Sequence, residues 1–301
     1  MTVGRVLVVG DVITDVVAVL GGPLAPGSDT PAAVRVAGGG QAANTAAWLA
    51  AAGVPVTLAG VAGDDPAGDA RLAELTAAGV TTAVRRAAGA VTGTIIVLSG
   101  GGERSMITDR GANLLLSPAD VDAAHTPDVA RLHLSGYALL DPATRPAARH
   151  ALSRGIPASV DAASAAPLRQ VGAKTFLEWV RGCDLLLANA DEAEALAGPG
   201  TPPDQARRLA AATGGNAVVK RGAAGAVWAS ADGTAIALPP ELAVAVDPAD
   251  PTGAGDAFAA GLLAALLRGA APLDALAAGH ALGARAVAMI GARPPAVRER
   301  H

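Results

Sequence analysis

The chain is poor in cysteine and in aromatic residues. Its 301 residues include one cysteine, Cys183, and aromatic residues make up only 2%. A single cysteine excludes an intramolecular disulfide framework and is typical of a reducing compartment, so we expect a cytoplasmic protein. Because aromatic rings are so few, a hydrophobic core has to be built from alanine, valine and leucine.

Charge is scarce as well. Only 17% of the residues are charged, the net charge is −4, and there is no block of basic residues, which argues against nucleic acid as a partner. The apolar stretch at residues 3–20 contains Arg5, Asp11 and Asp15, and no charge-free run is long enough to span a membrane. No small-residue cleavage site follows a basic start, so we expect neither a signal peptide nor a membrane partner.

Several common motifs are missing too. The sequence has no G-x-x-x-x-G-K-[ST], no G-x-S-x-G and no G-x-G-x-x-G. Its five histidines have no metal-ligand spacing. Hydrophobic residues nevertheless make up 51% of the chain, which excludes a disordered protein and leaves ample chain for a folded core.

The most informative stretch is Asp-Pro-Thr-Gly-Ala-Gly-Asp at residues 250–256, followed at once by an apolar run at residues 257–267. Gly253 and Gly255 let the backbone bend tightly and approach a ligand, and the run behind them has the strong helix formers of a buried helix. A glycine-rich turn that leads into a helix leaves several N–H groups aimed at one point, where the helix dipole favours negative charge. The stretch therefore predicts an anion-binding site.

Asp256 falls in the first turn of that helix. In a phosphoryl transfer, a carboxylate beside an anion site can take the proton of the attacking hydroxyl while the N–H groups stabilise the phosphoryl oxygens. The alternative is an acid that the helix dipole alone favours at this position.

Predicted strands and helices alternate along the chain. The β-branched run at residues 5–10 predicts a buried parallel strand, and Asp11 and Asp15 follow it at the edge where open α/β sheets bind ligands. Three glycines at residues 38–40 open a helix that extends to about residue 52. Further strands are predicted at residues 56–61, 132–135, 157–161, 185–188, 217–220 and 226–229. This rhythm indicates a parallel, doubly wound sheet.

Two signatures in this pattern resemble one known family. Residues 250–258 resemble the C-terminal motif D-T-T-G-A-G-D-x-F of the ribokinase-like (PfkB) sugar kinases, with Pro251 in place of the first threonine, and residues 38–44 resemble the N-terminal motif. The resemblance implies a single ribokinase-like α/β domain over residues 1–301. It would have a doubly wound, mainly parallel sheet flanked by helices and a small β-sheet lid. The lid strands would be inserted at about residues 12–37 and 91–112, where residues 16–20, 33–37, 92–99 and 104–108 have the pattern of strands.

The resemblance also implies roles for individual residues. It implies Asp256 as the catalytic base, and the N–H groups of Gly253, Ala254 and Gly255 as the anion hole. The implied sugar ligands are Asp11, Asp15, Gly39, Gly40 and Asn44. An acid that binds two vicinal hydroxyls makes a strong, geometry-selective contact. The alternative for Asp15 is an acid that caps a turn at a strand end.

The nucleotide side is implied by two shorter motifs. Asn189 and Glu192 resemble the N-x-x-E motif, in which the glutamate organises Mg²⁺ through water near the phosphates of ATP. The alternative is a helix N-cap followed by acidic residues in the first turn, which has the same sequence pattern. Residues 220–225 resemble a loop that lies against the nucleotide, with Lys220 adding charge near the phosphates. Gly222 and Gly225 belong to this loop, for which a glycine hairpin without a ligand is the alternative. His280 would lie near the adenine or pack within its helix.

A monovalent cation site is the last feature that the resemblance implies. In relatives, carbonyl groups after the last helix, here predicted at residues 273–289, hold a cation that shapes the anion hole. The corresponding residues are Asp250, Thr252, Ala286, Met289 and Gly291. A serine hydroxyl often completes the site, and Pro295 stands at its position, so the sequence leaves a K⁺ site open.

Three departures from the family pattern argue against ribose as the substrate. Gln41 stands for a lysine, Ile13 stands for an asparagine, and residues 132–137 lack a glutamate that ribose-specific members use. Arg104 and Arg110 either reach an acidic group on the substrate or lie on the solvated surface. We therefore expect free ribose to be a poor substrate compared with a larger sugar, a sugar acid or a nucleoside.

The sequence thus predicts an enzyme that uses ATP and Mg²⁺ to phosphorylate a hydroxymethyl group of a sugar or sugar-like small molecule. A nucleoside kinase of the same fold and a catalytically silent sugar-binding protein are the alternatives. Because a small sheet with exposed edges and apolar faces is a pairing liability, we also expect a homodimer that forms through the lid.

Overall fold

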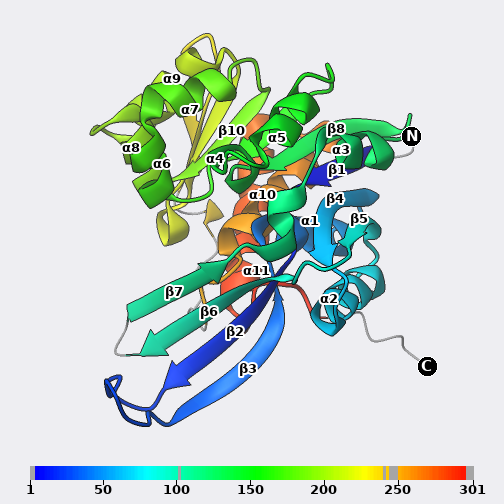
Figure 1. Cartoon of the computed structure of the whole chain (residues 1–301). Helices are drawn as coiled ribbons and strands as arrows, with labels where there is room; N and C mark the ends of the chain where they lie inside the picture. The colour runs from blue at the N-terminus through cyan, green and yellow to red at the C-terminus, as the bar shows by residue number, and fades with distance from the viewer. Residues whose placement is uncertain (1–3, 101–102, 240–241, 244–249, 296–301) are drawn as a thin grey trace, which may run out of the picture.

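A nine-stranded sheet forms the centre of the computed structural model, which describes residues 4–100, 103–239, 242–243 and 250–295 (Figure 1). Its strands are β1 (Arg5–Val9), β4 (Val56–Gly63), β5 (Thr81–Ala87), β8 (Val129–Ser135), β9 (Ala158–Asp161), β10 (Leu185–Asn189), β11 (Asn216–Lys220), β12 (Ala226–Ala229) and β13 (Ala235–Ala237). The order across the sheet is β13-β12-β11-β10-β9-β8-β1-β4-β5. From β11 to β5 all neighbours are parallel, and β12 and β13 are antiparallel.

The strand order reverses at β1. From β1 the chain builds outward through β4 and β5 on one side, then returns to β8 on the other side and continues outward. At such a reversal the crossover connections diverge, and they leave a crevice beyond the carboxyl ends of the strands. Val9 pairs with both Ala59 of β4 and Leu134 of β8, so the end of β1 lies at this crevice.

Helices cover both faces of the sheet. They are α1 (Gln41–Ala51), α2 (Pro66–Ala77), α3 (Pro118–Ala124), α4 (Tyr137–Leu140), α5 (Arg145–Leu152), α6 (Ala165–Val171), α7 (Ala173–Trp179), α8 (Ala190–Ala197), α9 (Pro202–Thr213), α10 (Ala254–Leu267) and α11 (Pro272–Val287), with short 3-10 turns η1 (Gly111–Leu115) and η2 (Gly222–Ala224). Alternate residues of β1 divide between two cores: Leu7 and Val9 face one, and Val6 and Val8 face the other. The first core contains residues of α3 to α9, and the second contains residues of α1, α10 and α11.

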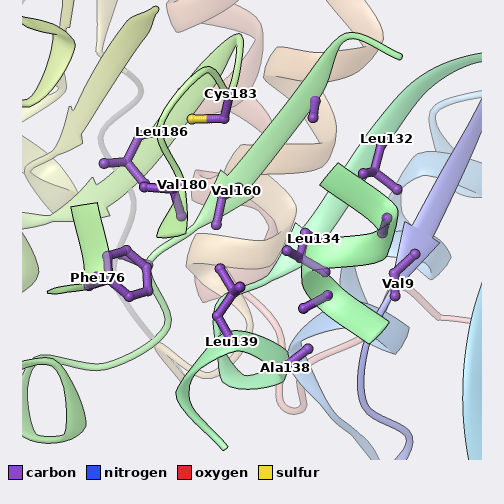
Figure 2. Packing of buried hydrophobic residues seen from close by; sticks show 14 of the residues in the cluster. Val9, Leu132, Leu134, Ala138, Leu139, Val160, Phe176, Val180, Cys183 and Leu186 are labelled. Carbon is purple, nitrogen blue, oxygen red and sulfur yellow. The ribbon is translucent and has the colours of Figure 1, made fainter. Parts of the chain in front are cut away.

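Small and branched side chains fill these cores, as the composition predicts. Figure 2 shows part of the first core, where Phe176 of α7 and Leu139 of α4 lie near Leu134 and Val160 on the sheet. Phe176 is one of only two phenylalanines in the chain, and it is completely buried. Among the described residues, no helix is long and apolar enough to cross a membrane.

The second sheet has four strands and projects from one end of the molecule (Figure 1). It consists of β2 (Ile13–Leu20), β3 (Ala32–Gly39), β6 (Gly93–Gly100) and β7 (Glu103–Asp109), in the order β3-β2-β6-β7. We call this sheet the lid. Its four strands lie within residues 13–39 and 93–109, and β2 and β3 are longer than the strands expected from the sequence because they continue to the base of the lid.

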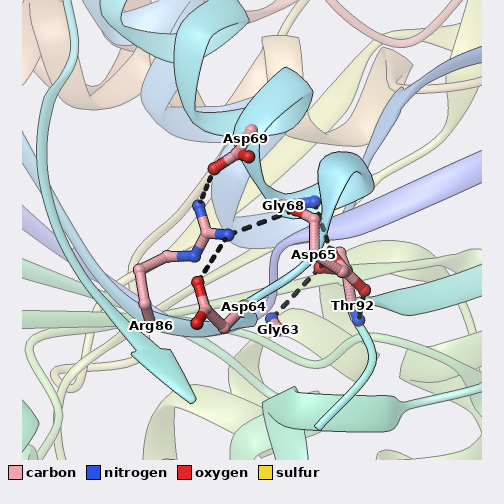
Figure 3. A network of polar contacts seen from close by, with 7 residues as sticks. All are labelled: Gly63, Asp64, Asp65, Gly68, Asp69, Arg86 and Thr92. Carbon is pink, nitrogen blue, oxygen red and sulfur yellow. Dashed lines mark hydrogen bonds and ion pairs between the residues drawn. The ribbon is translucent and has the colours of Figure 1, made fainter. Parts of the chain in front are cut away.

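A hydrogen-bonded cluster anchors β6 to the large sheet (Figure 3). The Asp65 carboxylate accepts from the Gly68 N–H at the start of α2, at 2.7 Å, and from the N–H and hydroxyl of Thr92 at 2.7 and 2.6 Å. The Thr92 hydroxyl in turn accepts from the Gly63 N–H at the end of β4, at 3.1 Å. The base of the lid is therefore fixed beside the carboxyl end of β4.

Two features of the sheet differ from the sequence-based expectation. The strand at residues 226–229 was expected in a parallel rhythm, yet β12 runs antiparallel to β11. Only the short turn η2 joins these two strands, and a connection of that length makes a hairpin, whereas a parallel neighbour needs a long crossover. The edge strands β5 and β13 were not predicted. Both are partly exposed; β5 contains Arg85 and Arg86, and β13 has only three residues.

Candidate active site

A cleft of about 490 Å³ opens at the carboxyl ends of β9, β10 and β11. The volume is in the range of pockets that hold a cofactor or drug-sized ligand. Predicted site residues that line it are Asn189, Glu192, Lys220, Gly222, Gly225, Ala254, Gly255, Asp256 and His280. Gln41, Asp161, Ala163 and Phe258 are further lining residues. The structure therefore gathers the predicted nucleotide residues and the glycine-rich turn at the start of α10 in one place.

The glycine-rich turn ends at the N-terminus of α10. Gly253 is the N-cap residue with φ 77°, in the left-handed region that favours glycine, and a Cβ there would lie 2.4 Å from the carbonyl oxygen of Ala292. The Ala254 N–H donates to the carbonyl of Pro251 at 3.3 Å. Within the described parts of the chain, the N–H groups of Gly253 and Gly255 have no acceptor. These two donors are therefore available to a bound anion.

Asp256 stands in the first turn of α10, at the floor of the cleft. Its Oδ2 accepts a hydrogen bond from the Asn44 amide nitrogen at 2.9 Å. The residue is half-buried where it lines the cleft, and desolvation by the surrounding protein raises the pKa of its carboxyl group well above the usual range. Smaller effects come from the Asn44 bond, which lowers this pKa, and from Asp161, which raises it. A base of raised pKa is a stronger proton acceptor once it is ionised.

Lys220, at the end of β11, brings a positive charge to the same point. Its Nζ lies 2.6 Å from Oδ2 of Asp161, and the two side chains are only 11% and 3% exposed. A Cβ at Gly255 would lie 3.3 Å from Nζ, so the ammonium group lies beside the first turn of α10. Burial lowers the Lys220 pKa, but the attraction of Asp161, Glu192 and Asp256 outweighs burial and raises it, so the group stays charged.

Sequence reasoning missed Asp161. It is the last residue of β9, and its Oδ1 accepts a hydrogen bond from the Gln41 side-chain nitrogen at 3.0 Å. Gln41 in turn accepts from the Ser135 hydroxyl at 2.6 Å, which links the start of α1 to the ends of β8 and β9. The available signal was its position: an acid at the carboxyl end of a parallel strand, the same signal that drew attention to Asp11.

Glu192 forms a capping box with Asn189 at the start of α8. Its two carboxylate oxygens accept from the backbone N–H and the side-chain amide of Asn189 at 2.8 and 2.6 Å. Burial raises its pKa to about 7, and the nearby Lys220 charge opposes that rise. Asn189 and Glu192 thus form the helix cap that was the alternative to a nucleotide site. The Glu192 carboxylate also lines the cleft and has lone pairs left for bound water.

The residues of the cleft fit ATP with Mg²⁺. Among the described residues, no group of three or more histidine, cysteine, aspartate or glutamate side chains could hold a metal directly. Mg²⁺ is usually held by one or two carboxylates together with waters and substrate phosphates, so a complete protein cage is not needed. Glu192 and Asp161 are the carboxylates that could accept such waters if Mg²⁺ and ATP were bound, while Lys220 and the N–H groups of the turn at Gly253 would face the phosphates.

The predicted sugar ligands lie next to Asp256, at the base of the lid. Asp11 accepts from the N–H groups of Gln41 and Ala42, both at 3.3 Å, and so caps α1. The Asp15 carboxylate lies against Gly39, where a Cβ would come within 2.2 Å of it. Burial raises the Asp15 pKa to about 6; Arg293 lowers it and Asp11 raises it by smaller amounts. Gly40 adopts φ 95° against the backbone of Asp11.

Arg110 lies at the same end of the site. Its guanidinium carbon is 5.2 Å from the centre of the Tyr137 ring. Its Nε is buried and has no hydrogen-bond partner within the described part of the chain. The residue is half-buried, so it is not a fully solvated surface arginine, and its role toward a substrate stays a prediction. The side chain of Arg104 is outside the described residues.

Two other sequence-based interpretations need adjustment. His280 of α11 lines the cleft, where its Nε2 is 3.2 Å from the carbonyl oxygen of Gly222. It therefore contacts the predicted nucleotide loop instead of merely packing within its helix. Ile13, which stands where ribose-specific members have an asparagine, is 1% exposed, and a Cβ at Gly93 would lie 2.7 Å from its Cδ1. Ile13 is thus part of the packed base of the lid.

The residues predicted for a monovalent cation come together around Asp250. The Asp250 carboxylate accepts from the Thr252 hydroxyl at 2.6 Å and from the Gly291 N–H at 3.1 Å. The Asp250 N–H donates to the carbonyl of Val287 at 3.1 Å. Ala286 and Met289 are joined by a backbone hydrogen bond in the following turn. Arg35 of β3 forms an ion pair with Asp250 at 3.1 Å, which ties the lid to this loop.

Comparison with known families gives the class of the protein. Residues 3–299 match the family described as pfkB family carbohydrate kinase, so the chain belongs to the PfkB family. The ATP-dependent ribose-1-phosphate kinase of Halopiger xanaduensis is 32% identical over 275 residues, which cover 90% of this chain and 87% of that protein. The bifunctional protein HldE of Halorhodospira halophila is 38% identical over 272 residues, which cover 84% of this chain and 52% of that protein.

Solved structures agree with this assignment. The adenosine kinase of Sinorhizobium meliloti has a TM-score of 0.82 at 25% identity, over 98% of this chain and 97% of that one. A structure of the ribokinase II type from E. coli, in complex with ATP and Mg²⁺, has a TM-score of 0.78 at 24% identity over 96% and 94% of the two chains. The expected ribokinase-like fold is confirmed, and the chain is an ATP-dependent kinase of the PfkB family.

Proposed function

We propose that this kinase transfers the γ-phosphoryl group of ATP to a hydroxymethyl group of a sugar or sugar-like acceptor, with Asp256 as the general base. The observation that carries the proposal is the position of Asp256, which is next to the free N–H groups of the turn at Gly253 on one side and to Asn44 on the other. A hydroxymethyl group beside its carboxylate would lose its proton as the phosphoryl group arrives.

Each half of the site has its own task in this proposal. The N–H groups of Gly253 and Gly255 and the Lys220 ammonium would stabilise the charge of the phosphoryl group during transfer. Asp15 and Asn44 would hold the hydroxyls of the acceptor and orient its hydroxymethyl group. Closure of the lid would exclude water, so that transfer outcompetes hydrolysis. Mg²⁺ would neutralise charge on the phosphates of ATP.

The acceptor that we propose carries an anionic group, as in a sugar phosphate or a sugar acid. Arg110 supports this choice, because a half-buried arginine next to Tyr137, whose buried Nε has no partner within the described part of the chain, suits a phosphate or carboxylate. A relative that is 32% identical is named as a ribose-1-phosphate kinase, which points the same way.

A panel of acceptors tests the function. Purified protein with ATP and Mg²⁺ is given ribose-1-phosphate, sugar acids, free pentoses and hexoses, and nucleosides, and the products are identified by ³¹P NMR. We expect the highest kcat/KM with an anionic acceptor. A highest value with D-ribose would reject the acceptor class, a highest value with a nucleoside would favour the nucleoside kinase, and no transfer to any acceptor would favour a silent binding protein.

Two further properties belong to the same proposal. The loop around Asp250 would bind K⁺ and shape the anion hole, so replacing K⁺ by a tetraalkylammonium ion should lower kcat. The lid would pair with the lid of a second subunit, so that the protein acts as a homodimer in the cytoplasm.

A further inference from the structure

Arg293, in the segment after α11, reaches the acceptor side of the site. Its side chain is 12% exposed and makes three contacts with residues more than 200 positions earlier in the chain. Nε donates to Oδ1 of Asn44 at 3.1 Å, and Nη2 donates to the carbonyl of Gly39 at 2.7 Å. Nη1 lies 3.3 Å from the Glu74 carboxylate.

The surrounding structure is shaped to receive this side chain. A Cβ at Gly38 would lie 2.1 Å from Nη1 of Arg293, so only glycine leaves room for the guanidinium group. The residue before it is held as well, because the Trp48 indole N–H donates to the carbonyl of Ala292 at 2.9 Å. The guanidinium group therefore has a fixed position instead of sampling the solvent.

Hydrogen-bond chemistry makes Arg293 decide which way Asn44 faces. Arginine has only donors, so the oxygen of the Asn44 amide must face it. An ionised carboxylate has only acceptors, so the nitrogen of the same amide must face Asp256. Both contacts are formed, at 3.1 and 2.9 Å, and Asn44 is 5% exposed, so water does not compete freely for either end.

We propose that Arg293 is a positioning residue for the general base, which acts through Asn44 to hold the Asp256 carboxylate ready to accept the acceptor's proton. The inference rests on the proposed role of Asp256. Without Arg293 the amide of Asn44 is free to turn, and its oxygen would then face the carboxylate and favour the protonated form of Asp256.

The inference predicts a change in pH dependence. The groups that face Asp256 are Asn44 on α1, Asp11 after β1, Asp161 on β9 and Lys220 on β11. Of these, Asn44 is the one whose orientation depends on Arg293. Its bond lowers the pKa of Asp256, so losing the bond raises that pKa, and the acidic limb of the kcat profile moves to higher pH. Arg293 also lowers the pKa of Asp15, which faces Asp11 and Arg71 as well.

The first experiment compares pH profiles of kcat for Arg293→Met and Arg293→Lys with the wild-type enzyme. We expect Arg293→Met to lose about tenfold or more in kcat, the scale of one hydrogen bond to a charged group, and to show the shifted acidic limb. Arg293→Lys keeps the charge without the planar guanidinium group, and its kcat should fall between those of the wild type and Arg293→Met. This variant also tests the inference if Arg293→Met does not fold. Glu74→Gln is the matched control: it removes the charge of the 44% exposed partner of Arg293 and should change kcat less than about threefold.

A double-mutant cycle separates positioning from general support of the fold. If Arg293 acts through Asn44 on Asp256, then Arg293→Met should have almost no effect on the residual kcat of Asp256→Asn. An equal loss in both backgrounds, or a loss in kcat with an unshifted acidic limb, would overturn the inference. The proposed function fails separately, if Asp256→Asn itself turns over like the wild type.

Discussion

The two sheets of the molecule differ in how far other parts of the chain cover their faces. In the large sheet both faces lie under helices, and all eight residues of β4 are buried. In the lid, Val34 and Val36 of β3 and Ile107 of β7 are 63%, 61% and 59% exposed. The register places them on one face, because Val16 pairs with Val36 and Ile96, and Ile96 pairs with Ile107. Asp15, the neighbour of Val16 along β2, points to the opposite face.

This difference suggests that the two sheets have different roles. The large sheet completes its own core, and the ends of its strands carry the groups that we propose for phosphoryl transfer. The lid has one face with Asp15, which we propose binds the acceptor, and one apolar face without a covering element among the described residues. A sheet of this kind is stable only if something else covers it, and we propose acceptor on one face and a second subunit on the other.

The largest effect should come from the chemistry at the large sheet. We expect Asp256→Asn to lose at least about 100-fold in kcat, the usual scale for loss of a general base. The ATP affinity, measured by calorimetry, should change little because the anion hole is made of backbone groups. The thermal unfolding midpoint should not fall, because burial penalises the charged form of Asp256 that the variant removes. Turnover close to that of the wild type would contradict the assignment of the base.

The next largest effect should be on the KM for the acceptor, when Arg110 is replaced. Arg110→Met should raise KM for an anionic acceptor by about 10- to 100-fold, the scale of a lost charge-assisted hydrogen bond, and leave KM for ATP unchanged. Steady-state kinetics with an anionic acceptor and its neutral analogue measure this. Arg154→Met, at a surface ion pair, is a suitable control. An equal rise in KM for both acceptors would show that Arg110 does not recognise the anionic group.

The third prediction concerns the free energy of unfolding. We expect the ionised Asp15 carboxylate on the inner face of the lid to destabilise the folded protein. Its pKa is raised from 3.8 to about 6, so its contribution to folding is fully present below pH 4 and is lost as the pH rises through 6. Asp15→Asn should therefore be more stable than the wild type at pH 8, by about 1–3 kcal/mol, and no more stable at pH 4. Urea unfolding at both pH values measures this. A less stable variant at pH 8 would refute the raised pKa.

The smallest expected effect on catalysis concerns the outer face of the lid. We expect light scattering at micromolar concentration to give the mass of a dimer, and the double variant Val36→Asp, Ile107→Asp to give the mass of a monomer. Because neither side chain is on the face of Asp15, kcat should fall less than threefold or so. A monomeric wild-type protein would contradict the proposed role of this face.

Local sequence predicted most of the fold and the groups that lie at the ends of elements. The strand at residues 5–9, the helix start at Ala254 and the capping box at Asn189 all follow from patterns a few residues long. Asp161 could have been recognised from its position. Arg293 could not, because it lies in irregular backbone and its meaning depends on contacts with Gly38 and Asn44, which no local pattern encodes.

The hydrogen bonds that complete the site also set the order in which the molecule can become active. Asn44 bonds to a residue 212 positions later and to another 249 positions later. Contacts this distant in sequence are slow to form, since the chain between them must first be ordered, and the N-terminal part is synthesised first. A nascent chain that has already built β1, the lid and α1 still has no positioned base. The catalytic centre is therefore assembled late, when nearly all of the chain is available to fold.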